Sequence, residues 1–299
     1  MIKDDINAKT KVFAVLGYPI EHSLSPLIQN TAAKMRGCDM VYTAMRVAPD
    51  ELKNAIQGGK ALGISGFNIT VPHKKNVMEH LCAIDPQAEM IGAVNTLKLT
   101  ENGYIGYNTD IIGVYYALKE QGVDVKGKNV LVTGAGGAGN ACAAMAVVRG
   151  AKNVYIANRT EETAEKLAAR FSETAAKNGC SVRSMGMYDI YGLENVDIVI
   201  NTTVLGFGDK AELTPIEDAS WYGRAGVNTV FDAVYSPWET RLLREAKAEG
   251  VKTINGFAML VYQALAAQEI WYETEFSADF KREVCEKITK YYTESIVKQ

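Results

Sequence analysis

A glycine-rich loop between a strand and a helix is the feature that most constrains how this chain can fold. In "NVLVTGAGGAGNACAAMAVVRG" a short apolar run ends in the spacing G-x-G-x-x-G, and an alanine-rich run follows. In such a loop the first glycine makes a tight turn, the second lets backbone approach a pyrophosphate, and the third lets helix meet strand. We therefore predict a Rossmann-type, doubly wound parallel sheet whose cofactor-binding loop comprises Gly134, Ala135, Gly136, Gly137, Ala138 and Gly139.

The end of the next strand indicates which dinucleotide is bound. An NAD enzyme places Asp or Glu there, roughly 20 residues past the glycines, to hold the ribose 2′-hydroxyl. Here the strand ends in Asn158, Arg159 and Thr160. A guanidinium and a hydroxyl can bind a 2′-phosphate, and arginine also stacks on an adenine ring. We therefore expect NADP; the alternative is that Arg159 is an ordinary surface arginine at a helix start.

Alternating strand and helix patterns divide the chain into two α/β domains. We expect a mixed α/β substrate domain at 1–110 plus 256–299, a Rossmann domain at 111–255, and a cleft between them. In the first domain, we expect a helix capped by Ser25, a helix at about 73–82 and a hairpin turning at Asn102–Gly103. The last forty residues read as helix and are expected to pack on the first domain through Phe280, Val284, Ile288, Tyr291 and Ile296.

Composition excludes several classes of function. A net charge of −3 and a pI near 5.8 argue against nucleic acid or an anionic membrane as a partner. Three histidines and five scattered cysteines form no cluster at metal-ligand spacing, so no metal is expected. The N-terminus lacks an apolar targeting segment, which favours the cytoplasm. A monomer and a homodimer both remain possible.

Two charged residues are candidates for acid–base chemistry. Lys74 follows a strand that ends at Pro72, and Asp110 follows the predicted hairpin. An enzyme that reduces a ketone needs a proton donor near the developing alkoxide, and a carboxylate beside an ammonium group would hold it and tune its proton transfer. On residue type alone, either side chain is more often a solvated charge.

Several strings together resemble the shikimate dehydrogenase family. They occur in the family's order from about residue 11 to Trp271: "GYPIEHSLSP", "NITVPHK", "GAVNTL", "GYNTD", "GAGGAG", "NRT", "DAVYSPWET" and "NGFAMLVYQ". The resemblance implies reversible hydride transfer between NADPH and 3-dehydroshikimate to give shikimate, a step of aromatic amino acid biosynthesis.

The resemblance also implies roles for individual residues. Lys74 matches the catalytic lysine and Asp110 its partner, which also contacts substrate, whereas Lys75 matches nothing and is expected to be solvated. Ser23 and Ser25 match the pair that holds the substrate carboxylate. The remaining substrate contacts implied are Thr70, Asn95, Tyr235 and Gln263, and the further cofactor contacts are Thr202, Val204, Phe207 and Gly256.

The chain departs from the commoner family pattern at two places. Phe207 stands where many relatives have methionine, in a loop expected against the nicotinamide. Asn255 and Phe257 stand where relatives often carry Asp and a small residue. We expect Phe207 to adjust the geometry of the bound cofactor with activity retained. We expect Asn255 and Phe257 to affect how the substrate fits near Gly256.

Three other interpretations of the sequence remain open. The quinate/shikimate branch of the family often uses NAD and accepts quinate; the serine pair and Arg159 argue against it. A non-catalytic NADP-binding sensor on the same scaffold would bind cofactor without turnover. A different reductase of this plan, such as a folate dehydrogenase, is not expected to carry the paired serines or "NITVPHK".

Overall fold

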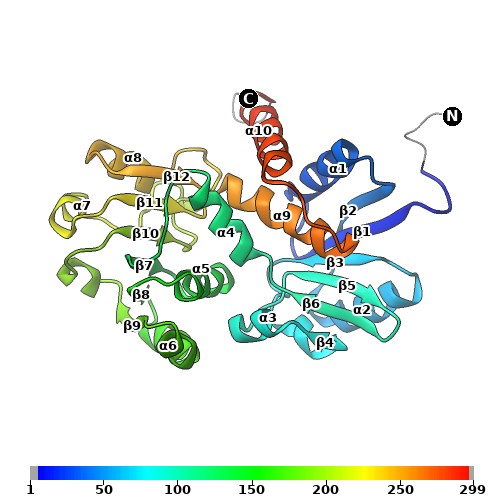
Figure 1. Cartoon of the computed structure of the whole chain (residues 1–299), viewed down its shortest axis with the longest axis horizontal. Coiled ribbons are helices and arrows are strands. Elements are labelled where there is room, and N and C mark those ends of the chain that lie inside the picture. The colour runs from blue at the N-terminus through cyan, green and yellow to red at the C-terminus, as the bar shows by residue number, and fades with distance from the viewer. Residues whose placement is uncertain (1–5, 296–299) are drawn as a thin grey trace. The chain divides into compact units, whose positions relative to one another are not determined.

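A computed structural model describes residues 6–295 of the chain, which fold into two compact units. Unit 1 comprises the chain up to Thr109 together with Val261–Tyr292, and unit 2 comprises Asp110–Leu260 with the residues from Thr293 onward. The division between them at 260/261 falls inside one helix, α9 (Phe257–Tyr272). Figure 1 labels the strands of both sheets.

Unit 1 is built on a mixed six-stranded sheet in the order β2-β1-β3-β5-β6-β4. Strands β1, β2 and β3 are parallel, whereas β5 runs antiparallel to both β3 and β6. The strands are β1 (Lys11–Gly17), β2 (Met40–Arg46), β3 (Gly66–Ile69), β4 (Ala83–Ile84), β5 (Thr96–Thr100) and β6 (Gly103–Tyr107). The predicted hairpin between β5 and β6 is confirmed, but its turn is at Glu101 and Asn102, one residue earlier than expected, because Gly103 begins β6 and pairs with Thr100.

The core of unit 1 lies on both faces of this sheet because successive residues of β1 point to opposite sides. Phe13 and Val15 pack with Ala267 and Trp271 of α9, while Ala14 and Leu16 pack in a separate cluster that includes residues of α2. The helices of this unit are α1 (Ser25–Arg36), η1 (Pro49–Glu51), α2 (Leu52–Ala61), η2 (Asn76–His80), α3 (Pro86–Ile91) and α10 (Ala278–Ser295, which continues past the unit boundary).

Unit 2 is a parallel six-stranded sheet in the order β12-β11-β10-β7-β8-β9 (Figure 1). Chain order reverses between β7 and β10, which defines a topological switch point, so the predicted doubly wound sheet is confirmed. The strands are β7 (Asn129–Thr133), β8 (Asn153–Asn158), β9 (Ser181–Gly186), β10 (Ile198–Asn201), β11 (Thr229–Asp232) and β12 (Lys252–Asn255).

Helices connect the strands of unit 2 and bury its sheet. Trp221 and Tyr222 of α7 are fully buried against β10 and β11 together with Leu242 and Leu243 of α8. The helices are α4 (Asp110–Lys119), α5 (Gly137–Val148), α6 (Glu161–Lys177), η3 (Asp189–Gly192), η4 (Gly208–Lys210), α7 (Ser220–Ala225) and α8 (Arg241–Ala248).

Three further local predictions are wrong. The helix expected at 73–82 is only the short 3₁₀ turn η2, because Met78 N–H bonds the carbonyl three residues back, at Lys75, and tightens the chain. Ser25 is the first residue of α1 and does not cap it. On α10, Tyr291 is exposed and its neighbour Tyr292 is buried; Ile296 lies outside the described residues.

No helix within residues 6–295 is both long and apolar enough to cross a membrane. No three His, Cys, Asp or Glu side chains within the same residues come together to hold a metal ion.

Candidate active site

Five of the predicted site residues follow or precede strand ends at a single edge of the unit 1 sheet. Ser23 and Ser25 follow the carboxyl end of β1, and Thr70 and Lys74 follow that of β3. Asn95 precedes β5, which runs antiparallel to β3, so it lies at the same edge; Ile69 N–H donates to its carbonyl at 2.8 Å. The topology therefore brings hydroxyl, amide and ammonium groups from three separated segments together.

The backbone that carries Lys74 is fixed on both sides. The carbonyl of Lys74 accepts from Val94 N–H at 2.8 Å, next to Asn95. The preceding residue, His73, is fully buried and its Nε2 lies 2.8 Å from the carbonyl of Val47. Lys74 is half-buried and Lys75 is exposed, which agrees with the expectation that only the second lysine is solvated.

The side chain of Asn95 is held in one orientation. Its Oδ1 accepts from the N–H and the hydroxyl of Thr109, at 2.8 and 3.2 Å, and from the hydroxyl of Thr96 at 3.0 Å. The Thr109 hydroxyl also lies 3.4 Å from Oε1 of Gln263, another predicted substrate contact. With its oxygen committed to these donors, the Asn95 amide presents its NH₂ group on the other side.

The two serines are arranged differently from the sequence expectation. The N–H of Ser25 donates to Oγ of Ser23 at 3.2 Å, so Ser23 serves the start of α1 that Ser25 was expected to cap. Both side chains are half-buried at this helix start. Hydroxyls beside the free N–H groups of a helix N-terminus form an environment that favours an anionic group.

A buried polar cluster beneath this edge was missed from sequence. Asn68 of β3 accepts from Tyr42 Oη at 2.7 Å and from Gln29 Nε2 at 3.1 Å, and donates to Thr96 Oγ1 at 3.0 Å. Burial raises the pKa of Tyr42 well above its ordinary value, so its phenol stays protonated and donates. The cluster fixes α1, β2, β3 and β5 against one another below the site.

The glycine loop of unit 2 has the close contacts that its spacing predicts. A Cβ at Gly139 would lie 2.0 Å from the carbonyl oxygen of Gly134, so helix α5 approaches the strand end more closely than any side chain allows. A Cβ at Gly136 would have no neighbour within 4 Å. The middle glycine therefore faces open space at the start of α5, as a pyrophosphate-binding loop requires.

The residues that end β8 are also at this loop. Asn158 Oδ1 accepts from Ala135 N–H at 3.2 Å, so it ties the strand end to the glycine loop. Arg159 and Thr160 are exposed, and Thr160 precedes α6 without capping it through its side chain. A guanidinium and a hydroxyl are thus accessible beside the loop, and no carboxylate ends the strand; these residues fit NADP.

The loop after β10 lies beside the glycine loop. The hydroxyl of Thr202 donates to the carbonyl of Thr133 at 2.8 Å and lies 3.2 Å from that of Gly134. Val204 and Phe207, in contrast, are exposed, with 61% and 56% of their surface accessible. Two large apolar side chains are therefore displayed on this loop, next to the turn that would carry the pyrophosphate.

The segments after β11 and β12 meet at Gly256. A Cβ there would lie 2.4 Å from the carbonyl oxygen of Ala233, so the two backbones are in close contact. Tyr235 packs edge-on against Phe257, with ring centroids 6.0 Å apart. Asn255 donates to the carbonyl of Trp238 and accepts from Phe257 N–H, so both residues that depart from the family pattern serve this junction.

Asp110 is buried and begins α4. It directly follows Thr109, whose contacts with Asn95 are described above. The Lys74–Asp110 pairing expected from the resemblance stays a prediction.

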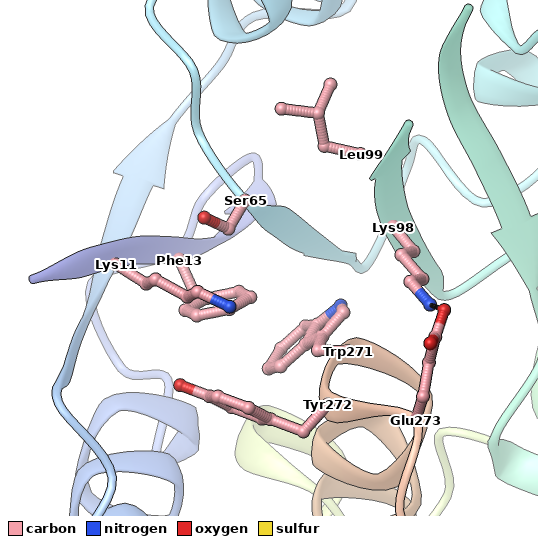
Figure 2. A pocket seen from close by; sticks show the side chains of 8 residues that line it. All are labelled: Lys11, Phe13, Ser65, Lys98, Leu99, Trp271, Tyr272 and Glu273. Carbon is pink, nitrogen blue, oxygen red and sulfur yellow. Dashed lines mark hydrogen bonds and ion pairs between the residues drawn. The ribbon is translucent and has the colours of Figure 1, made fainter. Parts of the chain in front are cut away.

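One hollow in unit 1 lies away from these residues. It has a volume of about 390 Å³ and contains none of the predicted site residues. Figure 2 shows Phe13 and Trp271 within it and the ion pair of Lys98 with Glu273 at one side. Lys11 begins β1 and Ser65 precedes β3, so this hollow lies at the sheet edge opposite Lys74.

Comparison with known proteins identifies the family. Residues 15–97 match the model for the shikimate dehydrogenase substrate binding domain, and residues 116–205 match that for shikimate / quinate 5-dehydrogenase. A shikimate dehydrogenase (NADP⁺) from Methanocaldococcus jannaschii is 46% identical, over 95% of this chain and 100% of the relative. This chain belongs to the shikimate dehydrogenase family.

Solved structures of the family share the fold over nearly the whole chain. A shikimate dehydrogenase in complex with NADP⁺ superposes with a TM-score of 0.83 at 42% identity, covering 95% of this chain and 97% of that one. The enzyme from Listeria monocytogenes, in complex with shikimate and NAD, gives 0.84 at 33% identity, covering 94% and 98%. Members of this family are therefore found with either dinucleotide.

The two family models cover most of the candidate site. The first spans Ser23 to Asn95, and the second spans the glycine loop and continues to Val204. Asp110, Phe207, Tyr235, Gly256 and Gln263 fall outside both matched segments. For Asp110, Tyr235, Gly256 and Gln263, the roles given above rest on the strings around them, whereas Phe207 lies in none of those strings.

Proposed function

We propose that this protein catalyses the reversible reduction of 3-dehydroshikimate to shikimate with NADPH. The observation that carries the proposal is the single sheet edge in unit 1 where two serines, Thr70, Lys74 and Asn95 come together. The other unit of the chain has a glycine loop whose geometry suits a dinucleotide. A carboxylate, ring hydroxyls and a ketone are the groups that such an edge can bind and polarise. The protein is accordingly an NADP-dependent oxidoreductase of the shikimate pathway.

The substrate groups divide among the residues by chemistry. Ser23 and Ser25 donate to the carboxylate, helped by the start of α1. Thr70 and Asn95 hydrogen-bond ring hydroxyls, with Asn95 turned to donate by its contacts with Thr109. Asp110, Tyr235 and Gln263 are the further contacts that we assign.

Lys74 supplies the proton. NADPH, when bound, supplies a hydride to the carbonyl carbon. As negative charge develops on the carbonyl oxygen, the Lys74 ammonium donates a proton to it, a role worth about 10²–10⁴-fold in rate. In shikimate oxidation the neutral amine accepts that proton back. We assign Asp110 to hold the lysine in line with the substrate oxygen.

Unit 2 holds the cofactor. The N–H groups of residues 134–139 and the start of α5 receive the pyrophosphate, Asn158 supports the loop, and Arg159 and Thr160 bind the 2′-phosphate. Thr202, Val204, Phe207 and Gly256 enclose the nicotinamide half. We assign unit 1 as the substrate-binding domain and unit 2 as the NADP-binding domain. We also place the protein in the cytoplasm, as a monomer or homodimer.

A two-by-two assay tests this function. Purified protein is followed by nicotinamide absorbance with shikimate or quinate as substrate and with NADP⁺ or NAD⁺ as cofactor. Turnover limited to shikimate and NADP⁺ is the expected result. No turnover in any combination, with NADP⁺ still bound, would replace the enzyme with a non-catalytic sensor.

The second candidate is a quinate/shikimate dehydrogenase. One of the matched family models covers quinate 5-dehydrogenases as well, and a relative is solved with NAD. Comparable turnover of quinate, or with NAD⁺, would assign the chain to this branch and leave the lysine mechanism unchanged.

A further inference from the structure

A chain of buried polar side chains crosses the carboxyl ends of three neighbouring strands in unit 2. Thr133 ends β7, Asn201 ends β10 and Asp232 ends β11, and all three are fully buried. The hydroxyl of Thr133 donates to Asn201 Oδ1 at 3.0 Å, and Asn201 Nδ2 donates to Asp232 Oδ1 at 2.8 Å. The apolar interior gives these groups no water to bond, so each depends on the next.

Asp232 is the last of these three hydrogen-bonded side chains. Its Oδ2 accepts from the hydroxyl of Thr240 at 2.6 Å, and its Oδ1 also accepts from Val234 N–H at 3.1 Å. Thr240 is itself fully buried and caps α8 by accepting from Leu243 N–H. One carboxylate thus binds the end of β10, the segment leading to Tyr235, and the start of α8.

Asn201 connects the same hydrogen-bonded side chains to the loop after β10. Its Oδ1 accepts from the N–H and the hydroxyl of Thr203, at 3.0 and 2.8 Å, so its NH₂ group is left to face Asp232. The loop that displays Val204 and Phe207 is therefore anchored, through Asn201, to the same carboxylate as the segment that carries Tyr235. Both segments are thus linked by hydrogen bonds to the one carboxylate.

The position of these segments identifies which half of the cofactor they serve. In a doubly wound sheet the dinucleotide crosses the strand ends at the switch point, here between β7 and β10. A bound dinucleotide would place its adenosine half on the β7–β8 side, where Arg159 lies, and its nicotinamide half on the β10–β11 side. Asp232 lies only on the nicotinamide side.

We propose that Asp232 is a positioning residue that shapes the nicotinamide half of the cofactor site by holding the 202–207 loop against the Tyr235 segment. This rests on the proposed function and deepens it. The role is separate from hydride and proton transfer, because the carboxylate is buried beneath the site and acts only through Asn201, Val234 and Thr240.

The test compares whole NADP⁺ with its adenosine half. Calorimetry measures NADP⁺ and adenosine 2′,5′-bisphosphate binding to the wild type and to Asp232→Asn. We expect NADP⁺ to bind about tenfold more weakly to the variant, equivalent to about 1.4 kcal/mol, while the bisphosphate changes by less than about twofold. Equal weakening of both ligands, or no change in either, would overturn the proposal.

A matched control is a carboxylate at the opposite end of the same sheet. Asp197 precedes β10 and accepts from Asn129 N–H at 2.9 Å and from Lys128. Asp197→Asn should leave both affinities unchanged. If it weakens NADP⁺ selectively as Asp232→Asn does, the effect belongs to the sheet in general and the proposal fails.

A second pair of variants keeps the test informative if Asp232→Asn does not fold. Thr240→Val removes one donor to the carboxylate and keeps the shape, whereas Thr240→Ser keeps the hydroxyl. We expect Val to weaken NADP⁺ selectively and to lower kcat, and Ser to restore both. Equal behaviour of Val and Ser would contradict the proposal. These binding measurements need no turnover, so an inactive wild type that binds NADP⁺ would refute the proposed reaction and leave this inference standing.

Discussion

The imidazole of His73 is bonded to the backbone carbonyl of Val47, with 2.8 Å between Nε2 and the oxygen. A carbonyl can only accept, so Nε2 is the donor in this bond, and the buried Nδ1 has no hydrogen-bond partner among the described residues. This bond joins the segment of Lys74 to the end of β2. It leaves the lysine side chain itself uninvolved.

Replacing His73 should therefore disturb catalysis through Lys74. His73→Phe fills the space and leaves the Val47 carbonyl unbonded; we expect kcat with shikimate to fall about tenfold while the affinity for NADP⁺ stays within about twofold. His73→Gln can offer an N–H donor and should recover part of kcat. Steady-state kinetics check this, and a folded Phe variant with wild-type kcat would contradict it.

Lys74→Ala should reduce kcat by about 10²–10⁴-fold because the proton donor is lost. NADP⁺ affinity should be nearly unchanged, since we assign cofactor binding to unit 2. The exposed neighbour provides the control, and Lys75→Ala should keep wild-type kcat. Turnover and NADP⁺ titration are measured on the same preparations, and a fully active Lys74→Ala enzyme rules out the donor role.

Arg159→Ala should weaken NADPH much more than NADH because only NADPH carries the 2′-phosphate. The loss expected for a charged hydrogen bond at this exposed site is about tenfold. Fluorescence titration with both cofactors measures the ratio. The control is Arg170→Ala, which removes an exposed arginine from α6, the helix that follows Arg159. An equal loss for both cofactors would remove the 2′-phosphate assignment.

Gly136→Ala separates binding from folding. The added methyl group meets no atom within 4 Å beyond its chain neighbours, and alanine is a poorer N-cap for α5 than glycine, so the free energy of unfolding should fall by no more than about 1 kcal/mol. It would occupy the space that we assign to the pyrophosphate, and NADP⁺ affinity should fall at least about tenfold. Gly139→Ala, in contrast, should fail to fold normally because of the contact with Gly134. Unchanged NADP⁺ binding by Gly136→Ala would show that the pyrophosphate lies elsewhere.

Asp232 should make the stability of the protein depend on pH. Burial raises the pKa of its carboxyl to about 6, from an ordinary 3.8, against the opposing effect of its hydrogen bonds. The folded state thus holds the proton more tightly than the unfolded state. The stabilisation is present below pH 4 and is lost as pH rises through 6, by about 3 kcal/mol in all.

The measurement is the free energy of unfolding of wild type and Asp232→Asn between pH 4 and 7. The wild type should lose stability relative to the variant as pH rises across this range. Parallel curves for the two proteins would show that Asp232 has an ordinary pKa.

The parts of the fold that depend on local sequence were predictable. The strand, glycine loop and helix at 129–148 follow from spacing alone, and so does the hairpin between β5 and β6. The helix expected after Pro72 was wrong because the segment forms a 3₁₀ turn, with Met78 N–H bonded to the Lys75 carbonyl, while His73 and Lys74 are bonded to the distant residues Val47 and Val94. Ser25 was misassigned as a cap because the position of Ser23 is set by the turn after Ile20, which the sequence pattern does not reveal.

The buried polar groups of the site were the least predictable. Asp232 reads in "VFDAVY" as one acidic residue in an apolar strand, and nothing nearby indicates a partner. Its partner Asn201 is brought alongside by a crossover through α7, so the pair is visible only once strand order is known. The same holds for Asn68, whose partners Gln29 and Tyr42 come from two other segments.

The end of β8 has a consequence for how cofactor preference can change over evolution. Asn158 is bonded to the glycine loop, so substituting it disturbs the pyrophosphate turn for any dinucleotide. Arg159 and Thr160 are exposed and carry no such structural duty. Preference for one dinucleotide over the other can therefore change by substitution of these two surface residues. The neighbouring asparagine meanwhile preserves the glycine loop, which both dinucleotides would use.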